Sequence, residues 1–132
     1  MDSKYILGIN ELDSQHEEIE QIFVALQKAI EDQEQRKNIP EIIENLREKL
    51  RYHFYAEESI MQVFAYPEFQ EHTRSHLEIL KSIESCKVTD LSESDIEYLR
   101  DHPMQLFFQQ IISQDLRFSK FIQRNKERMG IA

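Results

Sequence analysis

Six side chains of types that commonly bind metal ions recur in this chain at helical spacings. They are His16, His53, Glu57, His72, His76 and Asp115. His53 and Glu57 are four residues apart, and the histidines of the 72/76 pair have the same spacing. Because an α-helix turns about 100° per residue, residues four apart share a face, and two such imidazoles can hold one cation. A single pair of this kind is often an inert surface feature, so the set has to be judged together.

In each segment the candidate ligand takes a place that apolar side chains otherwise fill. His16 is followed at helical steps by Ile19 and further apolar residues. Asp115 lies between Ile111 and Phe118. A buried charge without a partner is costly. A core histidine bonded to a carbonyl would explain any one of these positions, whereas a bound cation explains all of them, so the pattern predicts a metal site inside the fold.

Length and composition predict one helical domain over residues 1–132. The chain has two glycines and three prolines among many helix-forming residues. We expect an all-α, up-down-up-down four-helix bundle with the metal site in its core. The expected helices cover about 14–32, 40–64 and 67–86, followed by a last segment that begins near Ser92 or Ser94.

Local signals set these boundaries. Asp13 is the expected cap of the first helix, and residues 32–38 are the expected first loop. Tyr66-Pro67 should separate the second helix from the third. Residues 89–94 are the longest expected loop, and Pro103 should kink or restart the last helix. Fraying is expected near Gly130.

Charge and composition exclude several classes of function. The formal net charge of −9 argues against a nucleic-acid partner, and no apolar run has the length of a membrane span. The single cysteine, Cys86, falls on an apolar helix face, which fits a reducing cytoplasm. The acidic surface could dock a reductase, although plain solvation is the commoner role of such charge. Nothing in the sequence indicates an oligomeric state.

Four segments resemble the hemerythrins, and specifically the single-domain bacteriohemerythrins. They are Gly8-Ile9 with Leu12 to His16, His53 to Met61, Tyr66-Pro67 with His72 to His76, and Ile111 to Asp115. The chain departs from the family in having no tryptophan, with Tyr5 in the region where one usually stands. It also has Gln110 where the family has its last histidine, five residues before the aspartate.

The resemblance implies a pair of iron ions with an oxo or hydroxo bridge. His16 and His53 would bind the first iron, His72 and His76 the second, and Glu57 and Asp115 would bridge them. Dioxygen would bind at an open position of the first iron. An apolar pocket would shield it from water, and the residues expected to form that pocket are Phe54, Leu106, Phe107 and Ile111. These residues would equally serve as ordinary core packing.

Gln110 leaves three arrangements open at the second iron. Its amide oxygen binds the ion, or it holds a water that does, or the second ion binds weakly. Another metal could also take the place of iron. His102 is a further candidate ligand, although it would lie about 12 Å from Gln110 along a continuous helix.

The resemblance favours a protein that binds dioxygen reversibly, for storage, delivery or scavenging, over an enzyme. Two alternatives from other classes are an enzyme that activates dioxygen or peroxide, as a peroxidase or ferroxidase does, and a sensor of oxygen or redox state. A metal-free structural bundle is the remaining alternative.

Overall fold

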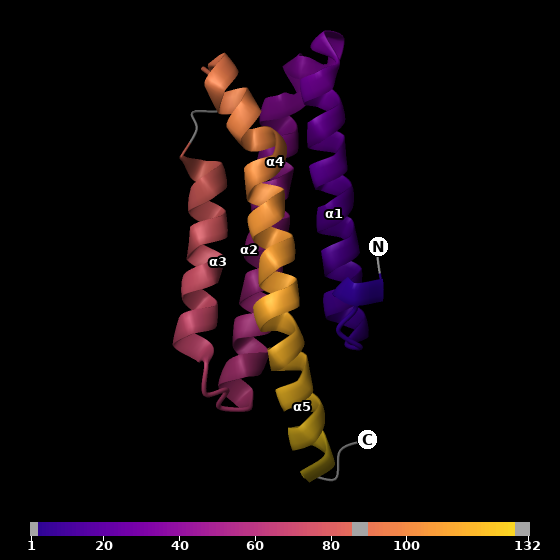
Figure 1. The fold of residues 1–132 in the computed structure, drawn as a ribbon, viewed down its shortest axis with the longest axis vertical. Helices are drawn as coiled ribbons and strands as arrows, with labels where there is room; N and C mark the ends of the chain where they lie inside the picture. Colours follow the sequence, from indigo (N-terminus) through magenta and orange to yellow (C-terminus); the bar gives the residue numbers. More distant parts are fainter. Residues whose placement is uncertain (1–2, 86–89, 129–132) are drawn as a thin grey trace.

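A computed structural model describes residues 3–85 and 90–128 of the chain. Long helices run side by side along one axis, and successive helices point in opposite directions (Figure 1). The described residues contain helices and no strand. This confirms the all-α four-helix bundle. Cys86, Thr89 and Gly130, which carried expectations from the sequence, lie outside the described residues.

The bundle consists of three helices and a fourth, longer rod. The helices are α1 (Asn10–Glu31), α2 (Ile39–Val63) and α3 (Phe69–Glu84), and the rod is α4 (Glu93–Gln110), η3 (Ile111–Asp115) and α5 (Leu116–Arg128). Two short 3-10 helices, η1 (Ser3–Tyr5) and η2 (Gln33–Asn38), precede α1 and α2. α1 packs against α2 and α4, and α3 packs against the same two helices, which closes the ring.

The first helix begins earlier than the sequence suggested. α1 starts at Asn10, so Asp13 lies inside its first turn and is not its N-cap residue. The Asp13 carboxylate instead accepts the backbone N–H groups of Leu7, at 2.7 Å, and Gly8, at 3.1 Å. Gly8 has a φ of +85°, which a residue with a side chain rarely adopts. Asp13 therefore fastens the preceding segment to α1 and, through its charge, stabilises the positive helix end.

Two further expectations about breaks in the chain are corrected. Residues 33–38 form the 3-10 helix η2 where a loop was expected, and the Asp32 carboxylate accepts the backbone N–H of Glu34 at its start. Pro103 does not restart a helix, because α4 continues through it. The first turns of α4 are nevertheless tilted from the rest of the rod (Figure 1), as expected near a proline. Ser92 caps α4 in a capping box with Asp95, as the sequence suggested.

The core is divided along the bundle axis. The half that contains the ends of α1 and α3 and the start of α2 is filled by apolar side chains such as Phe23, Leu46 and Ile83, each at most 1% exposed. The other half contains the candidate ligands together with aromatic residues. Close apolar packing of the first half holds the four rods in register, and this register places the polar side chains of the second half opposite one another.

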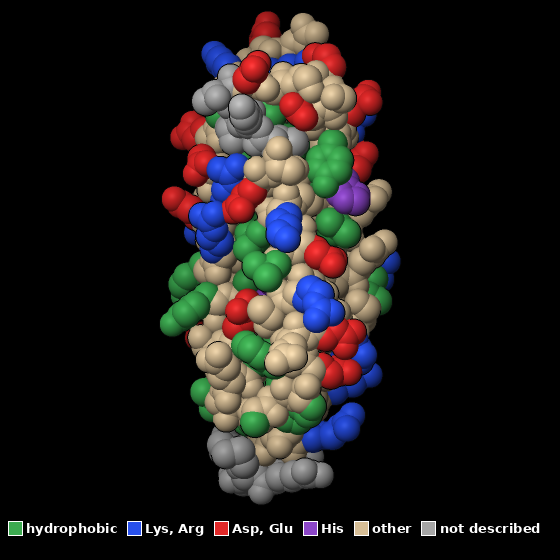
Figure 2. Space-filling view, turned by 90° about the vertical axis from the view of Figure 1, so that its left-hand side faces the viewer, with side chains coloured by type: hydrophobic (Ala, Val, Ile, Leu, Met, Phe, Trp, Pro, Cys, Tyr) green, Lys and Arg blue, Asp and Glu red, His purple; other side chains and the backbone are tan. Residues whose placement is uncertain are grey.

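The surface mixes both signs of charge. The face that includes α3 shows acidic, basic and hydrophobic side chains interspersed (Figure 2). Among the described helices, none combines the length and the apolar character that crossing a membrane requires.

Candidate metal centre

The structure brings the six candidate ligands together inside the bundle. Each contributing helix presents its ligands on its buried face: α1 and η3 contribute one each, and α2 and α3 contribute two each. All six are at most 1% exposed: His16, His53, Glu57, His72, His76 and Asp115. The inference from spacing, that these polar residues replace core positions, is therefore confirmed for the whole set.

Two imidazoles and two carboxylates form the first group of donor atoms. The Nε2 atoms of His16 and His53, from α1 and α2, are 2.8 Å apart. His16 Nε2 is 3.3 Å from Asp115 Oδ2, and His53 Nε2 is 3.3 Å from Glu57 Oε1. Four donors from three segments of the chain thus surround one point.

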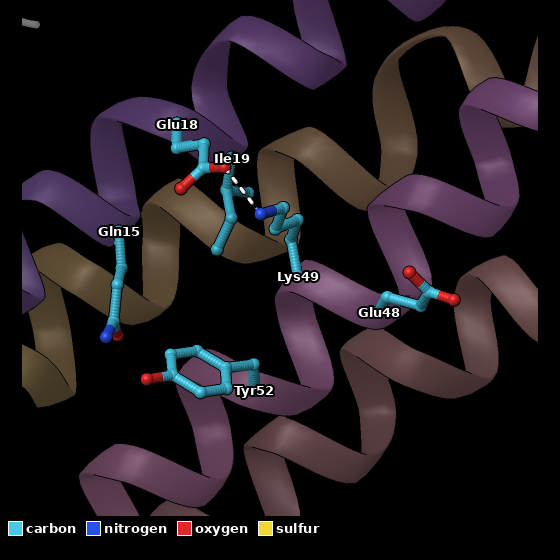
Figure 3. A pocket seen from close by; sticks show the side chains of 6 residues that line it. All are labelled: Gln15, Glu18, Ile19, Glu48, Lys49 and Tyr52. Carbon is cyan, nitrogen blue, oxygen red and sulfur yellow. Dashed lines mark ion pairs between the residues drawn. The ribbon is translucent and has the colours of Figure 1, made fainter.

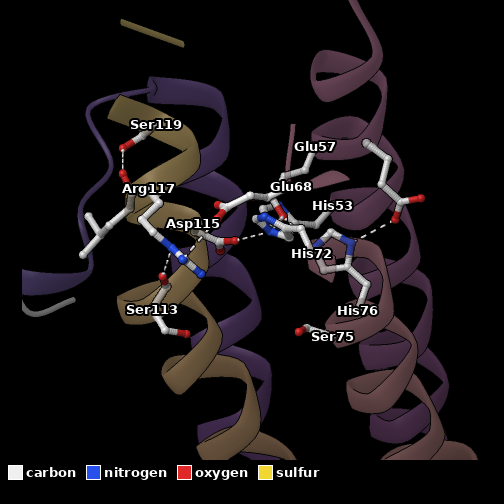
Figure 4. Close-up of polar contacts among 12 residues, drawn as sticks. His53, Glu57, Glu68, His72, Ser75, His76, Ser113, Asp115, Arg117 and Ser119 are labelled. Carbon is white, nitrogen blue, oxygen red and sulfur yellow. Dashed lines mark hydrogen bonds and ion pairs between the residues drawn. The ribbon is translucent and has the colours of Figure 1, made fainter. Parts of the chain in front are cut away.

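The second group shares both carboxylates with the first. His72 Nε2 is 2.7 Å from Asp115 Oδ1, and His76 Nε2 is 3.1 Å from Glu57 Oε1. Asp115 therefore directs one oxygen toward His16 and the other toward His72. Figure 4 shows the carboxylate of Asp115 and the ring of His72 facing one another across the space between η3 and α3. Two carboxylates between two histidine pairs form the arrangement expected of a dinuclear metal centre.

The unsatisfied atoms of this cluster show that a cation fits it. His72 Nε2 and Asp115 Oδ1 are close, but the contact is not a well-aligned hydrogen bond, and neither atom has a hydrogen-bond partner in the described chain. Glu57 Oε2 and Asp115 Oδ2 are also buried without a hydrogen bond there. The donors of each group lie within 4.8 Å of one another. Donors about 2.1 Å from an ion are up to about 4.2 Å apart, so each group can contract around one ion.

The comparison with known families agrees with this geometry. The family model of the hemerythrin HHE cation binding domain matches residues 7–118, which is most of the chain and includes all six ligand candidates. The chain belongs to the hemerythrin family. No curated protein and no solved structure matches it significantly. Family membership and the buried donor groups together identify it as a metal-binding protein.

Two outer residues of this hemerythrin centre were not predicted from the sequence. The Nδ1 atom of His53 is 2.7 Å from Gln15 Oε1, and the Nδ1 atom of His76 is 2.9 Å from Glu58 Oε2. When Nδ1–H donates to these oxygens, the lone pair of Nε2 is free for a metal ion. The only signal for either residue is its position beside a ligand, Gln15 before His16 and Glu58 after Glu57.

Gln15 also connects the centre to the surface. Together with Tyr52 it lines a pocket of about 330 Å³ between α1 and α2 (Figure 3). An ion pair between Glu18 of α1 and Lys49 of α2, 2.7 Å long, joins the two helices at the same pocket. The imidazole of His53 is thus one hydrogen bond away from a residue that lines this pocket.

Aromatic rings cover the centre on its inner side. Phe54 stacks on His76 with ring centres 3.9 Å apart, and Phe107 meets His16 edge-on at 5.5 Å. Ile111 is fully buried as well. Three of the four residues expected to form the apolar pocket therefore lie in the core. Such a shell lowers the local polarity around bound metal ions and restricts the access of water.

Leu106, the fourth of these residues, is only partly buried and lines a polar cavity instead. Gln110 lines the same cavity at the end of α4 and is 4% exposed. His102 is exposed, and its ring packs against Tyr98 with centres 4.8 Å apart. It belongs to neither donor group, so the structure does not support it as a substitute ligand.

A π-helical turn explains how residues five apart both face the core. Gln110 and Asp115 would differ by about 140° in a regular α-helix, which would turn one of them to solvent. The segment between them, η3, is π-helical, and its i→i+5 hydrogen bonds bring such residues onto a similar face. Both side chains are accordingly buried. Pattern analysis based on the α-helical period could not have found this turn.

Opposite charges control protonation in the metal-free centre. Burial alone would raise the pKa of Glu57, but the charges and hydrogen bonds of His53 and His76 outweigh it and hold this pKa well below its usual range. Burial would lower the pKa of His76, whereas hydrogen bonds to Glu57 and Glu58 and their negative charge raise it to about 9. The imidazole of His76 thus carries a proton where the metal-loaded centre would carry an ion.

The metal-free protein should lose stability as the pH rises from about 6.5 to about 9. His76 binds its proton more tightly in the folded than in the unfolded chain, so this contribution is complete below 6.5 and disappears as the pH passes the folded pKa. A shift of this size corresponds to about 3 kcal/mol at most. Urea unfolding of metal-free protein across this pH range would measure it. In Glu58→Gln the slope should be smaller, and a free energy of unfolding that rises over this range in the wild type would contradict the assignment.

Proposed function

We propose that the chain binds two iron ions at this centre and binds dioxygen reversibly, for storage, delivery or scavenging. The observation that carries this proposal is the sharing of Glu57 and Asp115 by two histidine pairs. Imidazole nitrogen and carboxylate oxygen are donors that suit iron. Two ferrous ions held side by side would supply the electrons that dioxygen takes up and returns.

The surrounding residues suit reversible binding. Gln15 and Glu58 orient the imidazoles of His53 and His76 through their Nδ1 atoms. Phe54 and Phe107 cover the inner side of the centre with apolar surface. Exclusion of bulk water by such a shell protects a bound ligand from protonation and displacement. A reductase that restores the ferrous state is the partner such a protein requires, and we place both in the cytoplasm, where reduced iron is maintained.

Loading with ferrous iron under anaerobic conditions tests the proposed function. We expect two irons per chain, together with an optical absorption that appears with dioxygen and disappears when the gas is exchanged for argon. The cycle should repeat without loss of amplitude. Irreversible oxidation in the first exposure, or binding of iron without any response to dioxygen, would contradict reversible binding.

One observation favours the enzymatic alternative, in which the centre activates dioxygen or peroxide. Gln110 adjoins a polar cavity, and an amide is a weaker donor than the imidazole expected from the family. A more accessible second iron would favour turnover over storage.

Gln110→His is therefore expected to lengthen the lifetime of the oxygenated form. The imidazole would bind more strongly than the amide and would exclude water from the second iron. An increase of about tenfold corresponds to a barrier higher by about 1.4 kcal/mol. The decay of the oxy absorption in the two proteins measures the effect. Equal lifetimes would show that Gln110 does not limit the stability of the oxy form.

A further inference from the structure

A polar cavity of about 150 Å³ lies between α3 and the rod of α4 and η3. Glu78 and Gln109 are exposed residues on its rim, and Gln110 and Gln114 form part of its inner wall. Figure 4 shows Ser75 on α3 and Ser113 on η3, which also line the cavity, on the two sides of the metal centre. Ser75 directly precedes a ligand of the second group, and Gln114 directly precedes Asp115.

The inner wall carries three buried polar atoms that no described protein group satisfies. They are both side-chain amide atoms of Gln110 and the Oε1 atom of Gln114. Each unsatisfied buried polar group costs about 1–3 kcal/mol. Gln110 is 96% buried and still leaves its donor and its acceptor without a partner in the described chain. Together with the unsatisfied Oε1 atom of Gln114 on the same wall, these two atoms indicate that a polar molecule in the cavity forms hydrogen bonds with them.

The atoms that are available define the chemistry of that molecule. The oxygens of Gln110 and Gln114 accept two hydrogen bonds, and the amide nitrogen of Gln110 donates. A small neutral molecule with two O–H donors and free lone pairs matches this set, and water and hydrogen peroxide both have it. Among the described residues no cationic side chain lines the cavity, and Glu78 lies on its rim, so a small anion is disfavoured. The polar lining also gives dioxygen no advantage over water.

We infer that this cavity is a binding site for hydrogen peroxide and its access route to the second metal. The inference rests on the proposed function, because the route leads to the His72 and His76 half of the centre. With two ferrous ions bound, each ion would give one electron to H2O2. The O–O bond would break and two hydroxide ions would form, leaving two ferric ions and requiring no further reductant. The apolar side of the centre, covered by Phe54 and Phe107, remains the side for dioxygen.

The first test uses metal-free protein labelled with 15N, so it does not depend on iron chemistry. The side-chain amide signals of Gln110 and Gln114 are followed during titration with H2O2 and after its removal by catalase. We expect shifts at both residues that saturate in the millimolar range and reverse, with none at Gln105. If the two amides do not respond to peroxide, the cavity is a hydration site only and the inference is wrong, even where iron and dioxygen bind as proposed.

The second test uses a matched pair of variants on α4. Gln109→Trp places a large ring at the rim of the cavity, whereas Gln105→Trp changes an exposed glutamine one turn away that does not line it. With ferrous protein under anaerobic conditions, we expect Gln109→Trp to slow oxidation by H2O2 about tenfold, a barrier increase of about 1.4 kcal/mol. Gln105→Trp should not change it, and dioxygen binding should be equal in both. Equal peroxide rates in the two variants would overturn the access route.

The two proposals can fail separately. If the protein binds no iron but the amide signals of Gln110 and Gln114 respond to peroxide, the proposed function is wrong and the peroxide-binding site is still supported. Gln110→Leu in the metal-free protein provides a further control, because it keeps the approximate size of the side chain and removes the amide. The peroxide response of Gln114 should weaken in this variant. A full response without Gln110 would show that Gln110 takes no part in binding.

Discussion

Glu57→Gln is expected to reduce the bound metal from two ions per chain to one or fewer. Glu57 belongs to both donor groups, and its Oε1 atom lies 3.3 Å from His53 Nε2 and 3.1 Å from His76 Nε2. The substitution preserves the size of the side chain and removes the negative charge that compensates two neighbouring cations. Loss of that charge leaves the two ions to repel each other in a buried site. Metal quantitation after loading and dialysis measures the result.

Glu58→Gln is the matched control for this variant. Glu58 is the next residue in the chain, but its carboxylate contacts the outer nitrogen of His76 and belongs to neither donor group. Loss of such an outer partner typically weakens metal binding roughly 10- to 100-fold without removing a ligand. We expect Glu58→Gln to retain two ions at saturating metal. Equal stoichiometry in Glu57→Gln and Glu58→Gln would contradict a bridging role for Glu57.

Metal binding is also expected to raise the melting temperature by roughly 25–30 °C. The buried carboxylates and imidazoles leave several polar atoms without partners in the described chain, and ions would satisfy them. An ion present at 1,000 times its Kd stabilises the folded state by about 4 kcal/mol, and two such ions act together. For a domain of this length, each kcal/mol shifts the melting temperature by about 3–4 °C. Calorimetry with and without a chelator measures the difference.

Zinc serves as the control for redox effects in this measurement, because it has no redox chemistry and accepts the same donors. A zinc-loaded protein should show a large increase too, and Glu57→Gln should show a small one. Identical melting temperatures for metal-free and metal-loaded protein would mean that the ions bind outside the folded core.

The sequence was sufficient to predict the bundle and the burial of all six candidate ligands. Both follow from the α-helical period, because apolar residues and ligands recur on one face of each segment. His53 and Glu57 illustrate this, because residues four apart on the apolar face of a helix both point toward the core. Patterns of this kind report the direction of a side chain, and here that direction brings the six candidate ligands together inside the bundle.

Features that depend on contacts between segments were not predictable in this way. Gln15 and Glu58 gain their roles only when α1 meets α2 and α2 meets α3. Asp13 was expected to cap a helix, but its carboxylate reaches back to a segment whose course the sequence does not reveal. The π-helical turn before Asp115 changes the number of residues per turn, so a search for the α-helical period does not detect it. Its effect is to turn Gln110 inward, where the polar cavity lies.

The position of the cations is tested most directly by a crystal structure of the iron-loaded protein with anomalous diffraction at the iron edge. We predict two anomalous peaks inside the bundle, one beside His16 and His53 and the other beside His72 and His76. The carboxylates of Glu57 and Asp115 should lie between the peaks. A single peak, peaks on the surface, or carboxylates turned away from both ions would contradict the dinuclear centre.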